Sequence, residues 1–246
     1  MRLRRLVEVG KAAARGGGGV GRCSLCQGPS VFVVAMENRR EGVLCVRCRS
    51  NPRQRALVQV LFDEAPAWPD RAVYEAGRTG AASRLLSERC RQFVTSNYLP
   101  AVPWGEFVDG VRSENLECLT FDDESFDVVV TQDVLEHVFN TDAAFAEIAR
   151  VLRPGGVHVF TVPFDPGKQS AVRARRTGAT IEHLEPAVYH GDPLDPSGVL
   201  VVTDWGVDLP DAVERASELK TKVVTVRDPS GRLPVPTAVF VSRKAG

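Results

Sequence analysis

The 246-residue sequence lacks any long apolar run. A membrane-spanning helix needs about 18 or more consecutive apolar residues, so the sequence predicts no transmembrane helix. The first residues, Met1–Arg5, are largely basic, but the apolar stretch that a secretory signal requires does not follow them. From these two absences we expect a cytoplasmic protein.

The sequence also lacks a net charge, because 31 Lys and Arg residues balance 31 Asp and Glu residues. This balance hides an asymmetry: residues 1–60 carry 12 basic and 3 acidic residues, whereas residues 61–246 carry 19 and 28. A basic segment of this kind indicates contact with a polyanion, contact with the acidic remainder of the chain, or a solvated face beside a metal site. Apolar residues make up 43% of the chain, which is enough for a folded core.

Cysteine is scarce and unevenly placed. Four of the six cysteines form two Cys-x-x-Cys pairs, Cys23/Cys26 and Cys45/Cys48, with 18 residues between the pairs. In a protein expected in the cytosol, such pairs indicate a metal site rather than disulfides. Four thiolates complete the tetrahedral coordination of a structural Zn²⁺; another metal or unpaired thiols are the alternatives. The remaining two, Cys90 and Cys118, are expected in the core.

The cysteine pairs belong to a small module over residues 21–62. Residues 1–20 before it, with four consecutive glycines, predict a flexible basic tail. Residues 31–34 predict a strand, and residues 52–62 predict a linking helix with Pro52 in its first turn. The module contains too little apolar material to fold unaided, so a bound metal is expected to stabilise it.

From residue 65 to residue 246, strand and helix patterns alternate, which is typical of a parallel sheet covered by helices on both faces. Strands are expected at 72–75, 93–96, 126–131 and 157–162, a weakly marked one near 107–111, and a closing antiparallel pair at 223–226 and 238–241. Helices are expected at 81–90 and 141–152. The predicted fold class is α/β, with a doubly wound, mostly parallel seven-stranded sheet whose last strand is antiparallel.

Three motifs follow one another along this alternation. The first is the turn Glu75-Ala-Gly-Arg-Thr-Gly80, and the second is residues 114–138, which end in Glu136-His-Val. The third is Arg150-Val-Leu-Arg-Pro-Gly-Gly-Val-His-Val-Phe. In order and spacing, residues 72–163 resemble the class I, Rossmann-like S-adenosylmethionine-dependent methyltransferases, and the type 11 group in particular. The glycine turn departs from the family pattern acid-x-Gly-x-Gly-x-Gly.

The resemblance implies S-adenosyl-L-methionine as cofactor. The cofactor-binding residues that it implies are Glu75, Gly77, Gly80, Asn97, Asn115, Leu116, Gln132 and Asp133. Asn97 stands where the family has a carboxylate for the ribose hydroxyls, with a plain turn as the alternative. Asn115 and Leu116 are expected at the adenine. His137 is expected as a buried, hydrogen-bonded residue under the cofactor, with catalysis as the alternative.

A polar segment after the third motif, residues 181–193, resembles the insertion that shapes the substrate pocket in this family. We expect His190 to act as a general base, because histidine titrates near neutral pH, and Asp192 to orient it. The alternative is a rigid loop whose polar groups are satisfied internally. Methyl transfer is an in-line displacement that needs no metal, so zinc is expected to be structural.

The sequence leaves three functions open. The first is methyl transfer to an oxygen, nitrogen or carbon of a small molecule such as a metabolite, sugar or natural product. The second is RNA methylation, in which Arg47, Arg49, Arg53 and Arg55 beside the second cysteine pair bind phosphate. Their segment, Cys-x-x-Cys-x-Ser-x-x-Arg-x-Arg, resembles the zinc ribbons at the N-termini of some bacterial methyltransferases. The third is a non-catalytic zinc-binding scaffold with a degenerate cofactor pocket.

Overall fold

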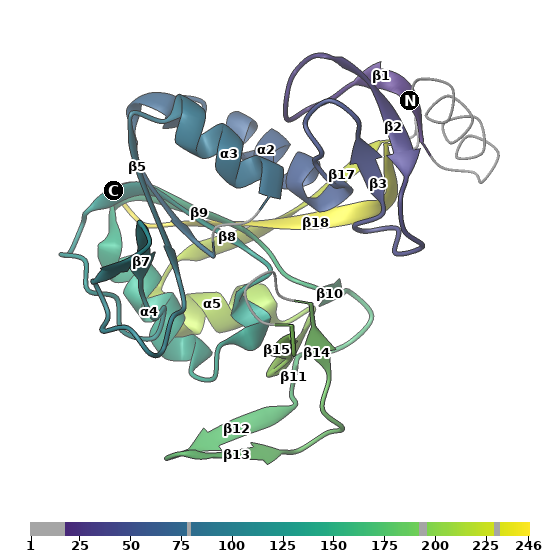
Figure 1. Cartoon of the computed structure of the whole chain (residues 1–246). Coiled ribbons are helices and arrows are strands. Elements are labelled where there is room, and N and C mark those ends of the chain that lie inside the picture. Colours follow the sequence, from purple (N-terminus) through teal and green to yellow (C-terminus); the bar gives the residue numbers. More distant parts are fainter. Residues whose placement is uncertain (1–17, 78–79, 192–195, 229–231) are drawn as a thin grey trace. The chain divides into compact units, whose positions relative to one another are not determined.

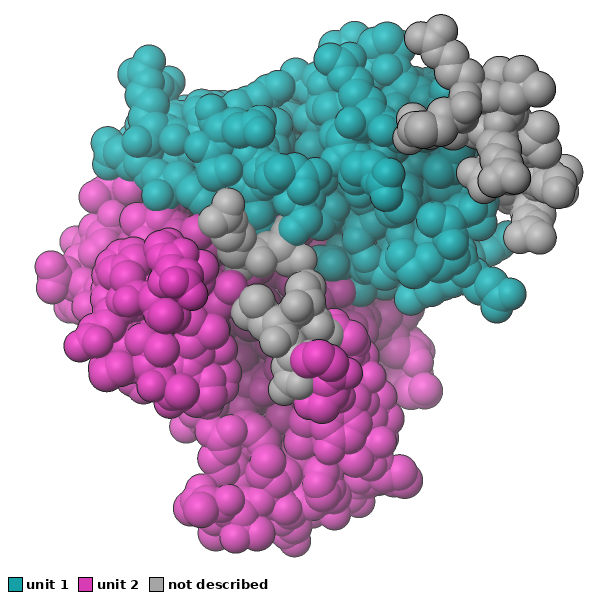
Figure 2. Space-filling model, in the orientation of Figure 1, with its two compact units in different colours: residues 1–71, 79–93, 223–239 teal, residues 72–78, 94–222, 240–246 magenta. Residues whose placement is uncertain are grey.

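A computed structural model of the chain describes residues 18–77, 80–191, 196–228 and 232–246 (Figure 1). The expected tail up to residue 17 and the candidate residue Asp192 lie outside the described residues. Two compact units divide the chain: unit 1 holds residues 1–71, 79–93 and 223–239, and unit 2 holds residues 72–78, 94–222 and 240–246 (Figure 2). Three separate chain segments contribute to each unit, and the domain boundary expected at residue 65 stays a prediction.

The cysteine ribbon opens unit 1. Its strands β1 (Gly19–Arg22), β2 (Pro29–Val34) and β3 (Val43–Cys45) form an antiparallel sheet in the order β1-β2-β3. Gly19 and Val20 pair with Phe32 and Val31, so the ribbon begins two residues before the expected start at residue 21.

Helix α2 (Pro52–Glu64) follows the ribbon, as the sequence predicts, and α3 (Gly80–Arg89) contributes to the same unit. Asn51 caps α2: its side chain accepts a hydrogen bond from the Gln54 amide, and the Gln54 side chain accepts one from the Asn51 amide. This reciprocal capping box satisfies two backbone donors that a helix start leaves unpaired, and Pro52 has no such donor to satisfy.

An eight-stranded sheet forms the larger part of the fold, in the order β17-β18-β9-β8-β4-β5-β7-β6. Its strands are β4 (Ala72–Ala76), β5 (Gln92–Asn97), β6 (Phe107–Val108), β7 (Val111–Ser113), β8 (Phe126–Gln132), β9 (Leu152–Thr161), β17 (Lys220–Asp228) and β18 (Leu233–Arg243). Strand β8 is parallel to β4 and β9, β5 is parallel to β7, and β18 is antiparallel to β9. The predicted fold class is confirmed, and β6 is an eighth strand, antiparallel to β7 at the edge.

Helices α4 (Thr141–Val151) and α5 (Leu209–Ser217) pack against each other in unit 2 (Figure 1). The predicted segment 141–152 contains α4, whereas α5 is an addition that the sequence analysis did not predict. Between them lies an insertion of short strands, from β10 (Phe164–Asp165) to β16 (Thr203–Gly206), which includes the β12–β13 hairpin. No helix in the described part of the chain is long and apolar enough to cross a membrane.

One ionisable side chain, His158, is buried in the centre of the sheet. It has no exposed surface, its Nε2 lies 3.1 Å from the Thr131 hydroxyl, and its ring stacks on Phe160. Burial lowers the pKa of His158 to about 3. A histidine in the unfolded chain has a pKa of about 6.5, so as the pH falls the unfolded state binds a proton at this residue before the folded state does.

We therefore expect His158 to make the protein sensitive to acid. Above the pKa that His158 has in the unfolded chain, its ring is neutral in both the folded and the unfolded state and does not affect stability. As the pH falls from there towards 3, the unfolded state takes up the proton and the folded state loses stability. Between pH 7 and pH 5 the loss amounts to about 2 kcal/mol in the free energy of unfolding. Urea unfolding at several pH values should show a shallower pH dependence for His158→Gln than for the wild type. Equal slopes in the two proteins would contradict this prediction.

Candidate functional site

The carboxyl edge of the parallel strands in unit 2 gathers most of the residues expected to bind the cofactor. Register places Ala76 of β4 beside Thr131 of β8 and Gln132 beside Thr161 of β9, so these strands end together. Parallel sheets bind ligands at this edge, where the loops that leave neighbouring strands diverge. Glu75, Gly77, Asn97, Gln132 and Asp133 all lie at or next to the carboxyl end of a strand.

Glu75 and Gln132 form a buried polar pair at this edge. Both side chains are almost completely buried, and Gln132 Nε2 donates to Glu75 Oε1 at 2.5 Å. The oxygen of the same amide, Gln132 Oε1, is buried and has no hydrogen-bond partner in the described part of the chain. A buried acceptor without a donor is costly, so a ligand that brings an N–H group to this position would be stabilised.

The turn after β4 depends on glycine at two positions. Gly77 has φ +77°, and a Cβ added to it would lie 2.8 Å from Val134 Cγ2. Its amide donates to the Ser96 carbonyl at 2.9 Å, which ties the turn to β5. Gly80 has φ +69°, and there an added Cβ would collide with the side chain of Gln54. Gly80 starts α3 in unit 1 and the other seven residues expected at the cofactor belong to unit 2.

The remaining cofactor candidates lie in turns. Asp133 follows β8 with φ +53°, and its amide donates to the Thr161 carbonyl. Asn97 ends β5, and its carbonyl accepts from the Glu114 amide. The Asn115 side chain accepts from the Glu117 amide at 3.0 Å, which fixes the turn that carries it. Leu116 is 6% exposed, so most of its side chain already packs inside the fold.

A second polar cluster follows β8, in the one-turn helix η2 (Leu135–His137). Glu136 is 1% exposed, and neither carboxylate oxygen has a hydrogen-bond partner in the described part of the chain. His137 Nε2 lies 3.7 Å and His190 Nδ1 3.6 Å from Glu136 Oε1. His190 comes from β14 (Tyr189–His190), so the insertion brings one of the predicted catalytic residues to this cluster.

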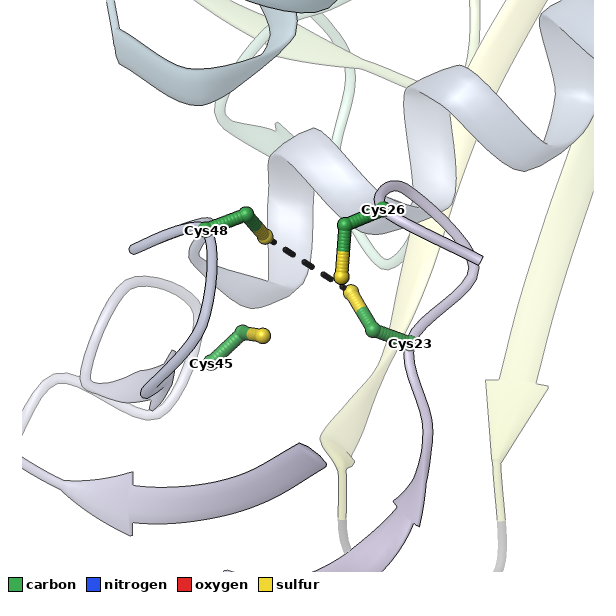
Figure 3. A group of neighbouring side chains, drawn as sticks. All are labelled: Cys23, Cys26, Cys45 and Cys48. Atoms are coloured by element: carbon green, nitrogen blue, oxygen red, sulfur yellow. Dashed lines mark hydrogen bonds between the residues drawn. The ribbon is translucent and has the colours of Figure 1, made fainter. Parts of the chain in front are cut away.

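The expected cysteine cluster is assembled in unit 1 (Figure 3). The four sulfur atoms of Cys23, Cys26, Cys45 and Cys48 lie within 4.8 Å of one another, and those of Cys23 and Cys48 are 3.8 Å apart. Tetrahedral Zn²⁺ with Zn–S bonds of about 2.3 Å places its sulfurs about 3.8 Å apart. The donor set and its spacing therefore fit zinc.

The two Cys-x-x-Cys turns share two backbone features. The amide of Cys23 donates to the Gly28 carbonyl and the amide of Cys45 to the Ser50 carbonyl, each at 3.0 Å. The residue after each pair, Gln27 or Arg49, has a positive φ of 53° or 67°. Both turns thus close in a similar way around their two thiols, and neither has glycine at the left-handed position.

A hydrogen bond links the Cys23 and Cys48 thiols of this cluster. This hydrogen bond with Cys48 lowers the pKa of the Cys23 thiol to about 4, and that same bond raises the pKa of Cys48.

Of the two isolated cysteines, Cys90 is buried, as expected, but Cys118 is exposed. The prediction for Cys118 was wrong because the residue lies in a surface turn, where its amide donates to the Asn115 carbonyl.

The arginines beside the second cysteine pair divide into two groups. Arg53 Nε donates to Glu41 at 2.7 Å. Arg55 is 2% exposed, lies over the Phe32 ring and donates to the carbonyls of Ser50, Val43 and Arg232. These two guanidinium groups hold unit 1 together, whereas Arg47 and Arg49 are exposed.

Arg55 and Arg232 also line a cleft of about 610 Å³ in unit 1. Asp63 and Asp228 also line this cleft, and Arg232 pairs with Asp228 through two hydrogen bonds. The cleft therefore carries charges of both signs, and its acidic residues disfavour the binding of a polyanion there.

Comparison with known proteins agrees with this fold. Residues 76–160 match the family described as a methyltransferase domain. A probable S-adenosylmethionine-dependent methyltransferase of Mycolicibacterium smegmatis is 38% identical over 71 residues, which cover 27% of this chain and 28% of the relative. The chain thus matches little more than a quarter of that relative's length.

Two solved structures share the fold. An S-adenosylmethionine-dependent methyltransferase from Mesorhizobium loti has a TM-score of 0.51 at 15% identity and covers 77% of this chain and 98% of its own. An S-adenosylmethionine-bound amino pentose methyltransferase from Micromonospora echinaspora has a TM-score of 0.50 at 18% identity, with coverages of 77% and 90%. Residues 76–160 therefore match a methyltransferase domain, and the chain shares the fold of these two S-adenosylmethionine-dependent methyltransferases.

Proposed function

We propose that this protein transfers a methyl group from S-adenosyl-L-methionine to an oxygen, nitrogen or carbon atom of a small molecule. The observation that carries the proposal is the buried pair of Glu75 and Gln132 beside the left-handed Gly77. The amino group of the cofactor is a cationic donor that suits Gln132 Oε1 and the Glu75 carboxylate. When bound, the cofactor supplies the electrophilic methyl group, and the chain has only to align the acceptor with it.

Charge favours a small acceptor over RNA. Residues 61–246 hold 28 acidic and 19 basic residues, which would repel phosphates near the strand ends. In the basic segment, Arg53 and Arg55 already pair within unit 1 and offer little to an external phosphate. The amino pentose methyltransferase among the fold relatives also acts on a small molecule, although at 18% identity the likeness extends to the fold alone.

Zinc has a structural role in this proposal. Cys23, Cys26, Cys45 and Cys48 supply four thiolates, which leave no open position for a substrate. Bound zinc would fix the two similar turns of the ribbon and so hold β1 to β3 in register. The ion takes no part in methyl transfer.

The test is a binding and turnover experiment with the full chain. Calorimetry with S-adenosyl-L-methionine should give one site per chain, and S-adenosylhomocysteine should form when the protein is incubated with a pool of small metabolites. RNA serves as the parallel acceptor pool, and salt-dependent RNA binding is the accompanying measurement. Product formed only with RNA would contradict the choice of acceptor, and absence of cofactor binding would favour a non-catalytic scaffold.

A further inference from the structure

The cluster of Glu136, His137 and His190 is not explained by cofactor binding. Its three donor atoms, Glu136 Oε1, His137 Nε2 and His190 Nδ1, lie within 4.8 Å of one another. Two imidazoles and one carboxylate form a donor set that suits first-row divalent cations and leaves open coordination positions. All three residues belong to unit 2 and are separate from the cysteine cluster of unit 1.

The hydrogen bond of the His137 ring shows why a cation fits here. His137 Nδ1 lies 2.8 Å from the Leu200 carbonyl oxygen, and a carbonyl can only accept, so Nδ1 carries the hydrogen of this bond. In the neutral ring, Nε2 then presents a lone pair towards Glu136 Oε1 at 3.7 Å. A lone pair that faces a carboxylate is repulsive unless a proton or a metal cation lies between them, so the geometry leaves a place for a cation.

The buried carboxylate of Glu136 is a second, independent reason to expect a cation at this cluster. The carboxylate is 1% exposed, and both of its oxygens lack a hydrogen-bond partner in the part of the chain that the structure describes. Burial of a charged group is costly when it is neither hydrogen-bonded nor bound to a metal. The backbone carbonyl of Glu136 accepts from the Val202 amide at 2.7 Å, which holds the residue in place with its carboxylate facing both histidines.

The surroundings resemble those of a metal ligand. Histidines that bind metals usually donate their other ring N–H to a backbone carbonyl or a carboxylate, as His137 does to Leu200. Ligands bonded to one ion at about 2.1 Å lie about 3 to 3.5 Å apart, and the separations of 3.6 and 3.7 Å from Glu136 Oε1 are only slightly longer.

We infer that Glu136, His137 and His190 bind one divalent transition-metal ion, whose open positions take an oxygen or nitrogen donor of the methyl acceptor. The substrate half of this inference rests on the proposed methyl transfer, whereas the metal half does not. The ion would hold the acceptor beside Gln132 and Asp133, which lie three to four residues before Glu136 in the chain.

Mn²⁺ is the probe that tests the site, because thiolates favour softer ions and the cysteine cluster competes for it only weakly. Titration of the full chain loaded with one equivalent of Zn²⁺, which the four thiolates bind first, followed by electron paramagnetic resonance, should show about one Mn²⁺ bound per chain. Glu136→Gln and His190→Ala should each weaken this binding at least about tenfold, or 1.4 kcal/mol. His183→Ala is the matched control, since His183 lies exposed in the same insertion and outside the cluster, and it should bind Mn²⁺ as the wild type does.

Circular dichroism melting separates loss of binding from loss of folding. His190 is partly exposed, so His190→Ala removes little packing and should melt close to the wild type. Absence of Mn²⁺ binding by the wild type, or binding that His190→Ala leaves unchanged, would overturn the inference. Calorimetry with S-adenosyl-L-methionine on the same preparations distinguishes this failure from failure of the proposed function, because cofactor binding does not require the ion.

Discussion

Replacing Cys45 with serine is expected to abolish zinc binding and to unfold the cysteine ribbon. The Cys45 thiol has no exposed surface and lies with three other thiols around one point. Binding of a structural zinc contributes about 10 kcal/mol or more to the folding of small modules, and loss of one of four thiolates forfeits most of it. Metal analysis should fall from one zinc per chain to none, and amide hydrogen exchange should become fast over residues 19–50.

The matched control for this variant is Cys118→Ser. Cys118 is exposed and remote in sequence from both Cys-x-x-Cys pairs, so this change removes a thiol without removing a ligand. It should retain one zinc and the exchange protection of the wild type. A Cys45→Ser protein that keeps both its zinc and its protection would show that the cluster is not a four-thiolate site.

Replacing Gly77 with alanine is expected to weaken binding of S-adenosyl-L-methionine at least about tenfold, or 1.4 kcal/mol. The left-handed conformation at φ +77° costs a residue with a Cβ about 1–2 kcal/mol. The new methyl group would also lie 2.8 Å from Val134 Cγ2. The turn must therefore shift at the place where the cofactor approaches the backbone, and calorimetry should show this in the dissociation constant.

Gly155→Ala separates the effect on binding from the effect on backbone strain. Gly155 has φ +76°, almost the same as Gly77, but no atom lies within 4 Å of its added Cβ. Both variants should lose stability through backbone strain, whereas only Gly77→Ala should lose affinity for the cofactor. Equal affinity in the two variants would refute a role for Gly77 at the cofactor.

Local patterns in the sequence were sufficient where neighbouring residues determine the structure. The capping residue Asn51, Pro52 and the apolar spacing of Leu57, Val60 and Leu61 specify α2 within a single segment. The buried valines of β8 likewise indicate a central strand. Short elements were harder: β6 and β7 together hold only five residues, so their periodicity is weak.

The cluster of Glu136, His137 and His190 shows the same division between what the sequence reveals and what only the fold reveals. Glu136 and His137 are visible as one motif, but His190 lies 53 residues further along the chain, and no spacing rule connects it to them. The link is tertiary: β14 pairs with β15 (Val199–Leu200), and the carbonyl of Leu200 holds His137. Arg53 and Arg55 likewise appear as exposed basic residues in the sequence, and only the fold shows that both are buried and paired internally.

By itself the sequence indicated the α/β fold class, a resemblance to the class I methyltransferases over residues 72–163, and the four cysteines that form one cluster. The fold class and the cysteine cluster depend on local periodicity and short spacings, and the resemblance depends on motifs that the order of residues states directly. The tertiary structure alone decided that Glu136 is buried without a hydrogen-bond donor and that two histidines from distant segments face it. Burial and orientation arise only when separate elements pack, so a site built from them is read from the folded chain.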